Sequence, residues 1–187
     1  MKLGVKYPAE TLTADEVRAL IAGCTKGSLG IRNRAMLYVL WRCGLRISEL
    51  LALRPADVTG DTVRVLHGKG NKARTVGLDA EAAAVVGQWM ERRKALGIKG
   101  PLFCSLKGEP LHTNAVRELL KRLAAKMGVE RRVTPHTFRH TFAANAARQI
   151  PVHYLQQALG HSSLSVTTGY VAHLGGEAVD AVRGLTY

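Results

Sequence analysis

The hydrophobic period of this 187-residue chain changes from helical to extended after Pro55, and this change most constrains the fold. Residues 62–66 (TVRVL) alternate, residues 68–71 (GKGN) have turn chemistry, and residues 73–78 are extended again. We predict an antiparallel hairpin with lysines at its tip, joined by a third strand near residues 57–58. Because helical patterns stand on both sides of it, we expect an α+β fold that is mostly helical with a small antiparallel sheet.

Helical periodicity dominates the rest of the chain. After a leader of residues 1–12, Thr13-Ala-Asp-Glu16 forms a capping box that opens a first helix. An apolar run at 31–43 predicts a buried helix closed by Gly44, and a short helix follows from Arg46 to before Pro55. Because the sequence contains no internal repeat and no convincing linker, we expect one domain over residues 13–187. Further helices are predicted at 80–96, 114–127 (capped by Thr113), 135–148, 151–159, 163–171 and 177–183.

The charge of the chain indicates an anionic partner. A net charge of +13 and a pI near 10.2 exceed what solubility requires. Such an excess favours nucleic acid over an anionic membrane or a ribosome, and no apolar run is long enough to span a membrane. We expect the second of three basic clusters to be a solvated helix face. The clusters are Lys69, Lys72 and Arg74; Arg92, Arg93 and Lys94; and Arg117, Lys121, Arg122, Lys126, Arg131 and Arg132.

The three cysteines indicate a reducing compartment. Cys24, Cys43 and Cys104 are odd in number, widely spaced and without a C-x-x-C pattern. This argues against a disulfide framework or a zinc knuckle and favours the cytoplasm. Cys24 and Cys43 lie in apolar helical patterns, so we place both in the core.

The stretch TPHTFRHTF (134–142) raises the question of what its basic side chains hold. His136 and His140 have the one-turn spacing of zinc-protease ligands. However, Thr137 stands where that motif needs a glutamate, and Arg139 would place a permanent positive charge beside the metal. A phosphate suits these residues better, because the Thr-Pro start caps a helix whose free N–H groups and dipole attract anions.

Four stretches occur together in a fixed order: GLRISELLAL, HGKGNKAR, HTFRH and LGHSSLSVTTGY. They resemble the sequence boxes of the tyrosine recombinases, the phage integrase family, from about Leu12 to Val171. Each motif alone is weak, whereas the ordered set is hard to obtain by chance. The resemblance assigns catalytic roles to Arg46, Lys69, His136, Arg139, His161 and Tyr170.

The resemblance implies a specific chemistry. Tyr170 attacks a DNA phosphodiester, giving a 3′-phosphotyrosine and a free 5′ hydroxyl, and the reverse attack by a 5′ hydroxyl reseals the strand. Lys69 protonates the leaving 5′ oxygen, while Arg46 and Arg139 stabilise charge on the non-bridging oxygens. Neither a metal, ATP nor another cofactor is required. Glu49 is expected to support the pocket.

Several assignments have alternatives. Lys72 lies near the same turn as Lys69 and competes for the hairpin role, and either lysine can instead hold backbone phosphates. His140 and His173 are expected to be structural histidines outside the pocket. Tyr154 lies in an apolar helical pattern and is placed in the core.

The chain also departs from the family. Most relatives carry a helical domain before the catalytic one, and this core-binding domain is expected to be absent here. Residues 177–183 either dock on a neighbouring protomer, giving a tetramer on two duplexes, or fold back on their own domain. We expect a cytoplasmic, nucleoid-associated recombinase that binds double-stranded DNA as a homotetramer. A type IB topoisomerase-like enzyme and a non-catalytic DNA-binding module are the alternatives.

Overall fold

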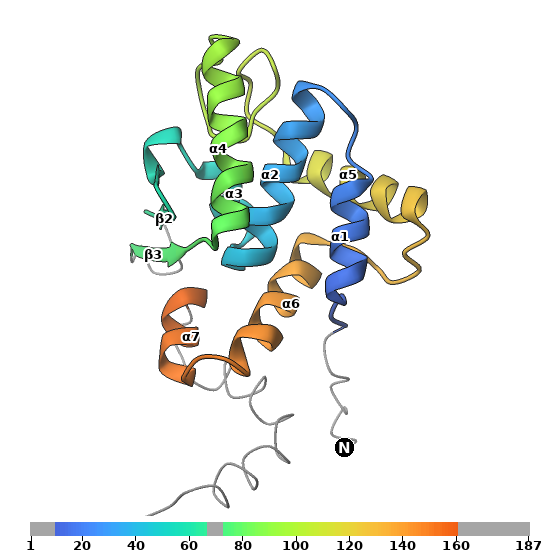
Figure 1. The fold of residues 1–187 in the computed structure, drawn as a ribbon, viewed down its shortest axis with the longest axis vertical. Helices are drawn as coiled ribbons and strands as arrows, with labels where there is room; N and C mark the ends of the chain where they lie inside the picture. Colours follow the sequence, from blue (N-terminus) through green and yellow to red (C-terminus); the bar gives the residue numbers. More distant parts are fainter. Residues whose placement is uncertain (1–9, 67–72, 161–187) are drawn as a thin grey trace, which may run out of the picture.

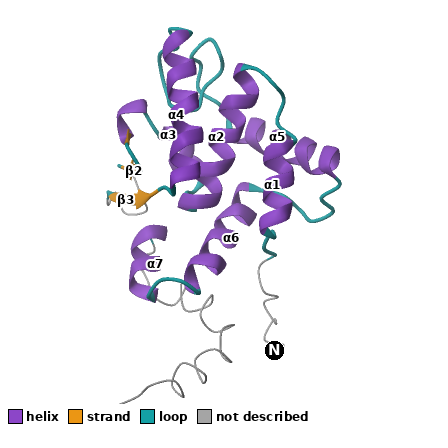
Figure 2. Cartoon of the chain, in the orientation of Figure 1, coloured by secondary structure: helices purple, strands orange, loops and turns teal. Residues whose placement is uncertain are grey.

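A computed structural model describes residues 10–66 and 73–160 of the chain (Figure 1). The predicted α+β class is confirmed, because the described part is mostly helical with one three-stranded antiparallel sheet of order β1-β2-β3 (Figure 2). The helices predicted at 163–171 and 177–183 lie outside the described residues. The elements are α1 (Ala14–Ala22), α2 (Ser28–Cys43), α3 (Ile47–Ala52), a 3-10 turn (Pro55–Asp57), β1 (Val58–Thr59), β2 (Thr62–Val65), β3 (Arg74–Gly77), α4 (Ala80–Ala95), α5 (Thr113–Met127), α6 (Pro135–Ala147) and α7 (Val152–Leu159).

Helix α2 forms the centre of the fold. It packs against α4 on one side, against α1 on the other and against α6 below in the view of Figure 1. Met36, Leu37 and Leu40 are fully buried, as the apolar run predicts. Trp89 of α4 is also fully buried and donates its indole N–H to the carbonyl oxygen of Leu102 at 2.8 Å. At the C-terminal end of α2, where the candidate site begins, Arg42 pairs with Asp79, the residue that caps α4, at 2.8 Å.

The helix starts are set by local hydrogen bonds. The predicted capping box is present, since the Glu16 N–H donates to the Thr13 hydroxyl and the Glu16 carboxylate accepts the Thr13 N–H. The prediction that Thr113 caps the helix at 114–127 is wrong. His112 has extended backbone angles and its ring nitrogen accepts the Asn114 N–H at 3.4 Å, so Thr113 is already helical.

The sheet has the predicted hairpin at its centre. Val63 pairs with Val76, and Val65 pairs with Arg74, so the chain reverses between residues 66 and 73. Val63, Val65 and Val76 are buried on the face that meets the helices. The tip itself, with the two lysines at 69 and 72, lies outside the described residues.

Two predictions of burial are wrong. Arg93 does not lie on a solvated face, because it is buried and donates to the carbonyl oxygens of Gly100 and Pro101, both at 3.1 Å. Tyr154 does not belong to the core, because it is 55% exposed. The short helix α7 buries one stripe through Leu155 and Leu159, and Tyr154 precedes that stripe. The three cysteines are buried, which confirms the placement of Cys24 and Cys43.

The chain before α1 is anchored at its described end. Leu12, the last residue of the predicted leader, is buried, and its N–H donates to the Thr141 hydroxyl at 2.9 Å. No helix in the described part of the chain combines the length and the apolar character needed to cross a membrane.

Candidate active site

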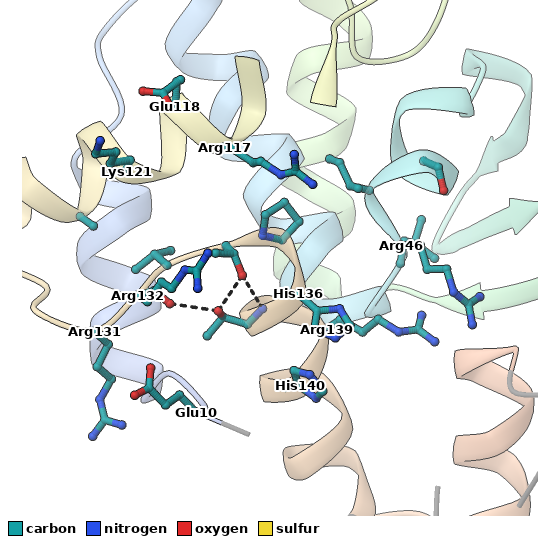
Figure 3. Close-up of a pocket in the computed structure, with 18 residues that line it drawn as sticks. Glu10, Arg46, Arg117, Glu118, Lys121, Arg131, Arg132, His136, Arg139 and His140 are labelled. Carbon is teal, nitrogen blue, oxygen red and sulfur yellow. Dashed lines mark hydrogen bonds between the residues drawn. The ribbon is translucent and has the colours of Figure 1, made fainter. Parts of the chain in front are cut away.

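A cavity of about 1090 Å³ opens where α5, the start of α3 and the start of α6 meet (Figure 3). Arg46, His136 and Arg139 all line it, so the structure brings together the three predicted catalytic residues that it describes. The other three, at 69, 161 and 170, lie outside the described residues. Basic side chains from α5 and from the loop before α6 contribute to the lining: Arg117, Lys121, Arg131 and Arg132.

Arg139 is built into the junction between α2 and α3. Only 5% of the residue is exposed. One terminal nitrogen donates to the Gly44 carbonyl oxygen and the other to the Leu159 carbonyl oxygen, each at 2.7 Å. Gly44 ends α2 with φ of 58°, and an added Cβ would lie 2.2 Å from the Phe142 ring. Glycine at this position therefore permits both the left-handed turn and the close contact with α6.

Arg46 is held at the N-terminus of α3 by Glu49. The backbone N–H and the Nη1 group of Arg46 donate to the two carboxylate oxygens of Glu49 at 2.8 and 2.9 Å. A longer contact of 3.5 Å joins Arg46 Nη2 to the Gly160 carbonyl oxygen. The Arg46 side chain is 29% exposed, so part of its guanidinium remains open to the cavity. Glu49 thus makes the supporting contact that the sequence suggests.

The Glu49 carboxylate has a second arginine partner. Arg74 of β3 donates through Nη1 and Nη2 to the two oxygens at 3.0 and 2.7 Å. Burial raises the pKa of the Glu49 carboxyl, but the hydrogen bonds from Arg74 and Arg46 outweigh it and hold the pKa below its ordinary value. Glu49 is therefore an ionised anion between two cations.

The start of α6 has the predicted cap. The Thr134 hydroxyl accepts the Thr137 N–H at 3.1 Å and lies 2.8 Å from the Thr137 hydroxyl, which donates to the Arg132 carbonyl oxygen (Figure 3). These bonds fix the first turn, from which His136 projects with an exposed side chain into the cavity. The turn therefore presents His136 and the N-terminal end of the helix dipole to the same space.

His140 belongs to the cavity lining, contrary to the expectation that it lies outside the pocket. Its ring packs edge-on against His136, with ring centroids 4.3 Å apart. Burial, followed by the charges of His136 and Arg139, lowers the pKa of His140 to about 4. The one-turn spacing to His136 was the sequence signal for this position. Among the described residues, no group of three or more histidine, cysteine or acidic side chains is placed to hold a metal ion.

Arg74 supports the site although its sequence neighbours did not suggest this role. It was grouped with Lys69 and Lys72 in a basic cluster, but its side chain is only 8% exposed and its Nε–H donates to the Ala158 carbonyl oxygen at 2.7 Å. Three guanidinium groups therefore contact the successive carbonyls of residues 158–160, where α7 ends. Cations are favoured there by the negative end of the helix dipole. Strand alternation was the missed signal, because Arg74 shares a strand face with the buried Val76.

Residues 10–176 match the phage integrase family. The chain belongs to this family. Tyrosine recombinase XerC of Pelobacter propionicus is 33% identical over 163 residues, which cover 85% of this chain and 54% of the relative. The chain thus spans about half the length of the curated relatives it matches.

Two solved structures of the family resemble the fold closely. The crystal structure of XerA recombinase matches with a TM-score of 0.80 and 28% identity, covering 95% of this chain and 66% of that one. XerH site-specific recombinase bound to its difH substrate matches with a TM-score of 0.72 and 26% identity, covering 86% of this chain and 49% of that one. The fold of this phage integrase family member is thus similar to the folds of both proteins.

Proposed function

We propose that this chain is the catalytic domain of a tyrosine recombinase, which cleaves and rejoins DNA strands through a 3′-phosphotyrosyl intermediate. The observation that carries the proposal is the pair of arginines, Arg46 and Arg139, that line one cavity and are both tied to the end of α7. Membership of the phage integrase family supports it.

The arrangement of the cavity suits a phosphodiester in the transition state. Negative charge gathers on the non-bridging oxygens as a nucleophile attacks, so fixed cationic donors accelerate the reaction. Two planar guanidiniums held in place by Glu49 and by backbone carbonyls meet this requirement. The capped N-terminus of α6 adds its dipole beside His136, which we assign to positioning the phosphate.

The remaining roles fall on residues outside the described part of the chain. Tyr170 is the proposed nucleophile; a tyrosine has an ordinary pKa of about 10, and a cationic pocket favours its phenolate. Lys69 is the proposed general acid for the leaving 5′ oxygen, and His161 donates a further hydrogen bond to the phosphate. The pocket needs neither a metal nor another cofactor in this mechanism.

Double-stranded DNA is the proposed substrate. The cavity is lined by four basic side chains from α5 and from the loop before α6, which suit backbone phosphates. The relative XerH is in complex with its difH substrate. We extend the proposal to a homotetramer on two duplexes, acting on the nucleoid in the cytoplasm.

The experiment that tests these roles first requires a substrate. A pool of nicked duplexes with randomised sequence is incubated with the chain, and the covalently trapped DNA is recovered and sequenced. This sequence is then prepared with an ordinary scissile phosphate and with a 5′-bridging phosphorothiolate, whose sulfur leaves without a proton.

Lys69→Ala is expected to cleave ordinary DNA slowly and to recover on the phosphorothiolate, because a missing general acid no longer matters. Arg139→Ala is expected to remain slow on both substrates, because its role lies on the non-bridging oxygens. Rescue of Lys72→Ala instead would move the general acid to Lys72, and rescue of neither lysine variant would limit the hairpin to DNA positioning. Failure to trap any duplex would favour a non-catalytic DNA-binding module.

A further inference from the structure

We infer that Arg74 is a positioning residue for strand cleavage, which orders Arg46 through Glu49 and ties both to the end of α7. The inference rests on the proposed function, because Arg46 is one of the proposed phosphate-binding arginines. Arg74 itself faces protein groups, so its effect on the phosphate is indirect.

The contacts of Arg74 connect α3 to the end of α7. Both terminal nitrogens bond the Glu49 carboxylate, at 3.0 and 2.7 Å, and Nε bonds the Ala158 carbonyl oxygen at 2.7 Å. The side chain of Glu49 is 3% exposed, so this pair is formed away from water. A planar guanidinium can satisfy a carboxylate with two parallel bonds and still use its third nitrogen, whereas the ammonium of lysine cannot match that geometry.

The charge balance explains why Arg46 needs Arg74. Glu49 carries one negative charge and contacts two arginines, so the three side chains together have one positive charge in excess. Without Arg74, Glu49 would neutralise Arg46 alone, and the excess charge that a phosphate needs would be lost. The buried carboxylate would also have fewer donors, which favours a shift of Arg46 toward it and away from the cavity.

The position of Arg74 links three parts of the site. It is the first residue of β3, the strand that leaves the hairpin tip carrying Lys69. It contacts the last turn of α7, the helix that precedes the chain segment carrying His161 and Tyr170. Gly160 permits this approach, since an added Cβ there would lie 2.9 Å from Arg74 Nη1 and the residue has φ of 62°.

Cleavage kinetics provide the first test. Single-turnover cleavage and DNA affinity are measured on the duplex recovered by trapping. We expect Arg74→Lys to slow cleavage by roughly 10- to 100-fold, the range typical of losing a partner that orients a metal-binding side chain, with little change in DNA affinity. Arg74→Ala is expected to be slower still, because the charge is lost as well. Arg93→Lys is the matched control, since Arg93 is also a buried arginine that bonds backbone carbonyls, but those of Gly100 and Pro101 in the loop after α4.

A double-mutant cycle distinguishes positioning from general stabilisation. If Arg74 acts through Arg46, adding Arg74→Ala to Arg46→Ala should cost little beyond Arg46→Ala alone. Independent, multiplying losses would overturn the inference, as would normal cleavage by Arg74→Lys. A defect that is wholly a loss of DNA affinity would make Arg74 a DNA contact and would also overturn it.

NMR tests the same inference without any cleavage. The Nε–Hε signal of Arg46, assigned by its absence in Arg46→Lys, should shift or broaden in Arg74→Lys and stay in place in Arg93→Lys. An unchanged signal in Arg74→Lys would overturn the inference. Absence of covalent DNA trapping by the unaltered chain would instead count against the proposed function, and the Arg46 signal would still decide the role of Arg74.

Discussion

The depressed pKa of His140 predicts that protonation of this side chain in acid destabilises the fold. The ordinary pKa of 6.5 is lowered to about 4 by burial and by the charges of His136 and Arg139. Between these two values the unfolded chain binds a proton at His140 and the folded chain does not. The free energy of unfolding therefore falls as the pH drops from 6.5 toward 4 and is unaffected by this group above 6.5.

The size of the effect follows from the shift. Each pKa unit corresponds to about 1.4 kcal/mol, so the full shift has a ceiling of about 3 kcal/mol. His140 is partly exposed beside a cavity open to solvent, which screens the interaction, and about 2 kcal/mol is expected at pH 4.5. His140→Gln removes the titrating group but keeps a polar side chain of similar size.

The assay is urea unfolding of His140→Gln and of the unaltered chain at pH 7.5 and pH 4.5. The free energy of unfolding of the variant minus that of the unaltered chain should be about 2 kcal/mol larger at pH 4.5 than at pH 7.5. His153→Gln is the control, because His153 is exposed on α7, and its relative stability should stay the same. An equal response of both variants to pH would refute the argument that burial and the neighbouring charges keep His140 neutral.

Three further predictions follow from the structure and the proposed chemistry. In a urea titration, Gly44→Ala should lower the free energy of unfolding by about 2 to 4 kcal/mol, because it combines left-handed backbone strain with a clash against Phe142. Gly60→Ala, also at φ of 58° but with open space around it, should lower it by only about 1 kcal/mol. DNA cleavage should persist in excess EDTA, and a loss restored by magnesium or zinc would contradict the arginine-based mechanism. DNA affinity should fall steeply with salt, with a slope of log K against log salt near −5 if about six phosphates are neutralised; a flat response measured by anisotropy would mean that the basic side chains do not face the duplex.

The features that were predictable from the sequence are those that local interactions decide. The capping box at Thr13, the cap at Thr134 and the hairpin are set by residues a few positions apart. The ordered motifs placed Arg46 and Arg139 in one cavity, because the family resemblance carries spatial information that periodicity lacks.

The features that were predicted wrongly depend on partners distant in the chain. Arg74 was counted in a basic cluster because its neighbours are lysines, yet its partners are Glu49 and the carbonyl of residue 158. Arg93 is buried because a loop after α4 supplies carbonyl acceptors. Tyr154 is exposed because α7 buries a single stripe. A charged or aromatic side chain takes its environment from tertiary contacts, which composition and spacing do not encode.

The residue that becomes covalently joined to DNA is the most direct test of the proposed recombinase activity. The trapped nicked duplex is digested with nuclease and protease, and the peptide carrying the nucleotide is located by mass spectrometry. We predict a 3′-phosphotyrosyl bond at Tyr170, no adduct with Tyr170→Phe and nearly unchanged DNA affinity in that variant. Trapping by Tyr154→Phe, which alters an exposed tyrosine of α7, should be normal. A nucleotide mapped to any other residue, or a Tyr170→Phe chain that still traps DNA, would contradict it.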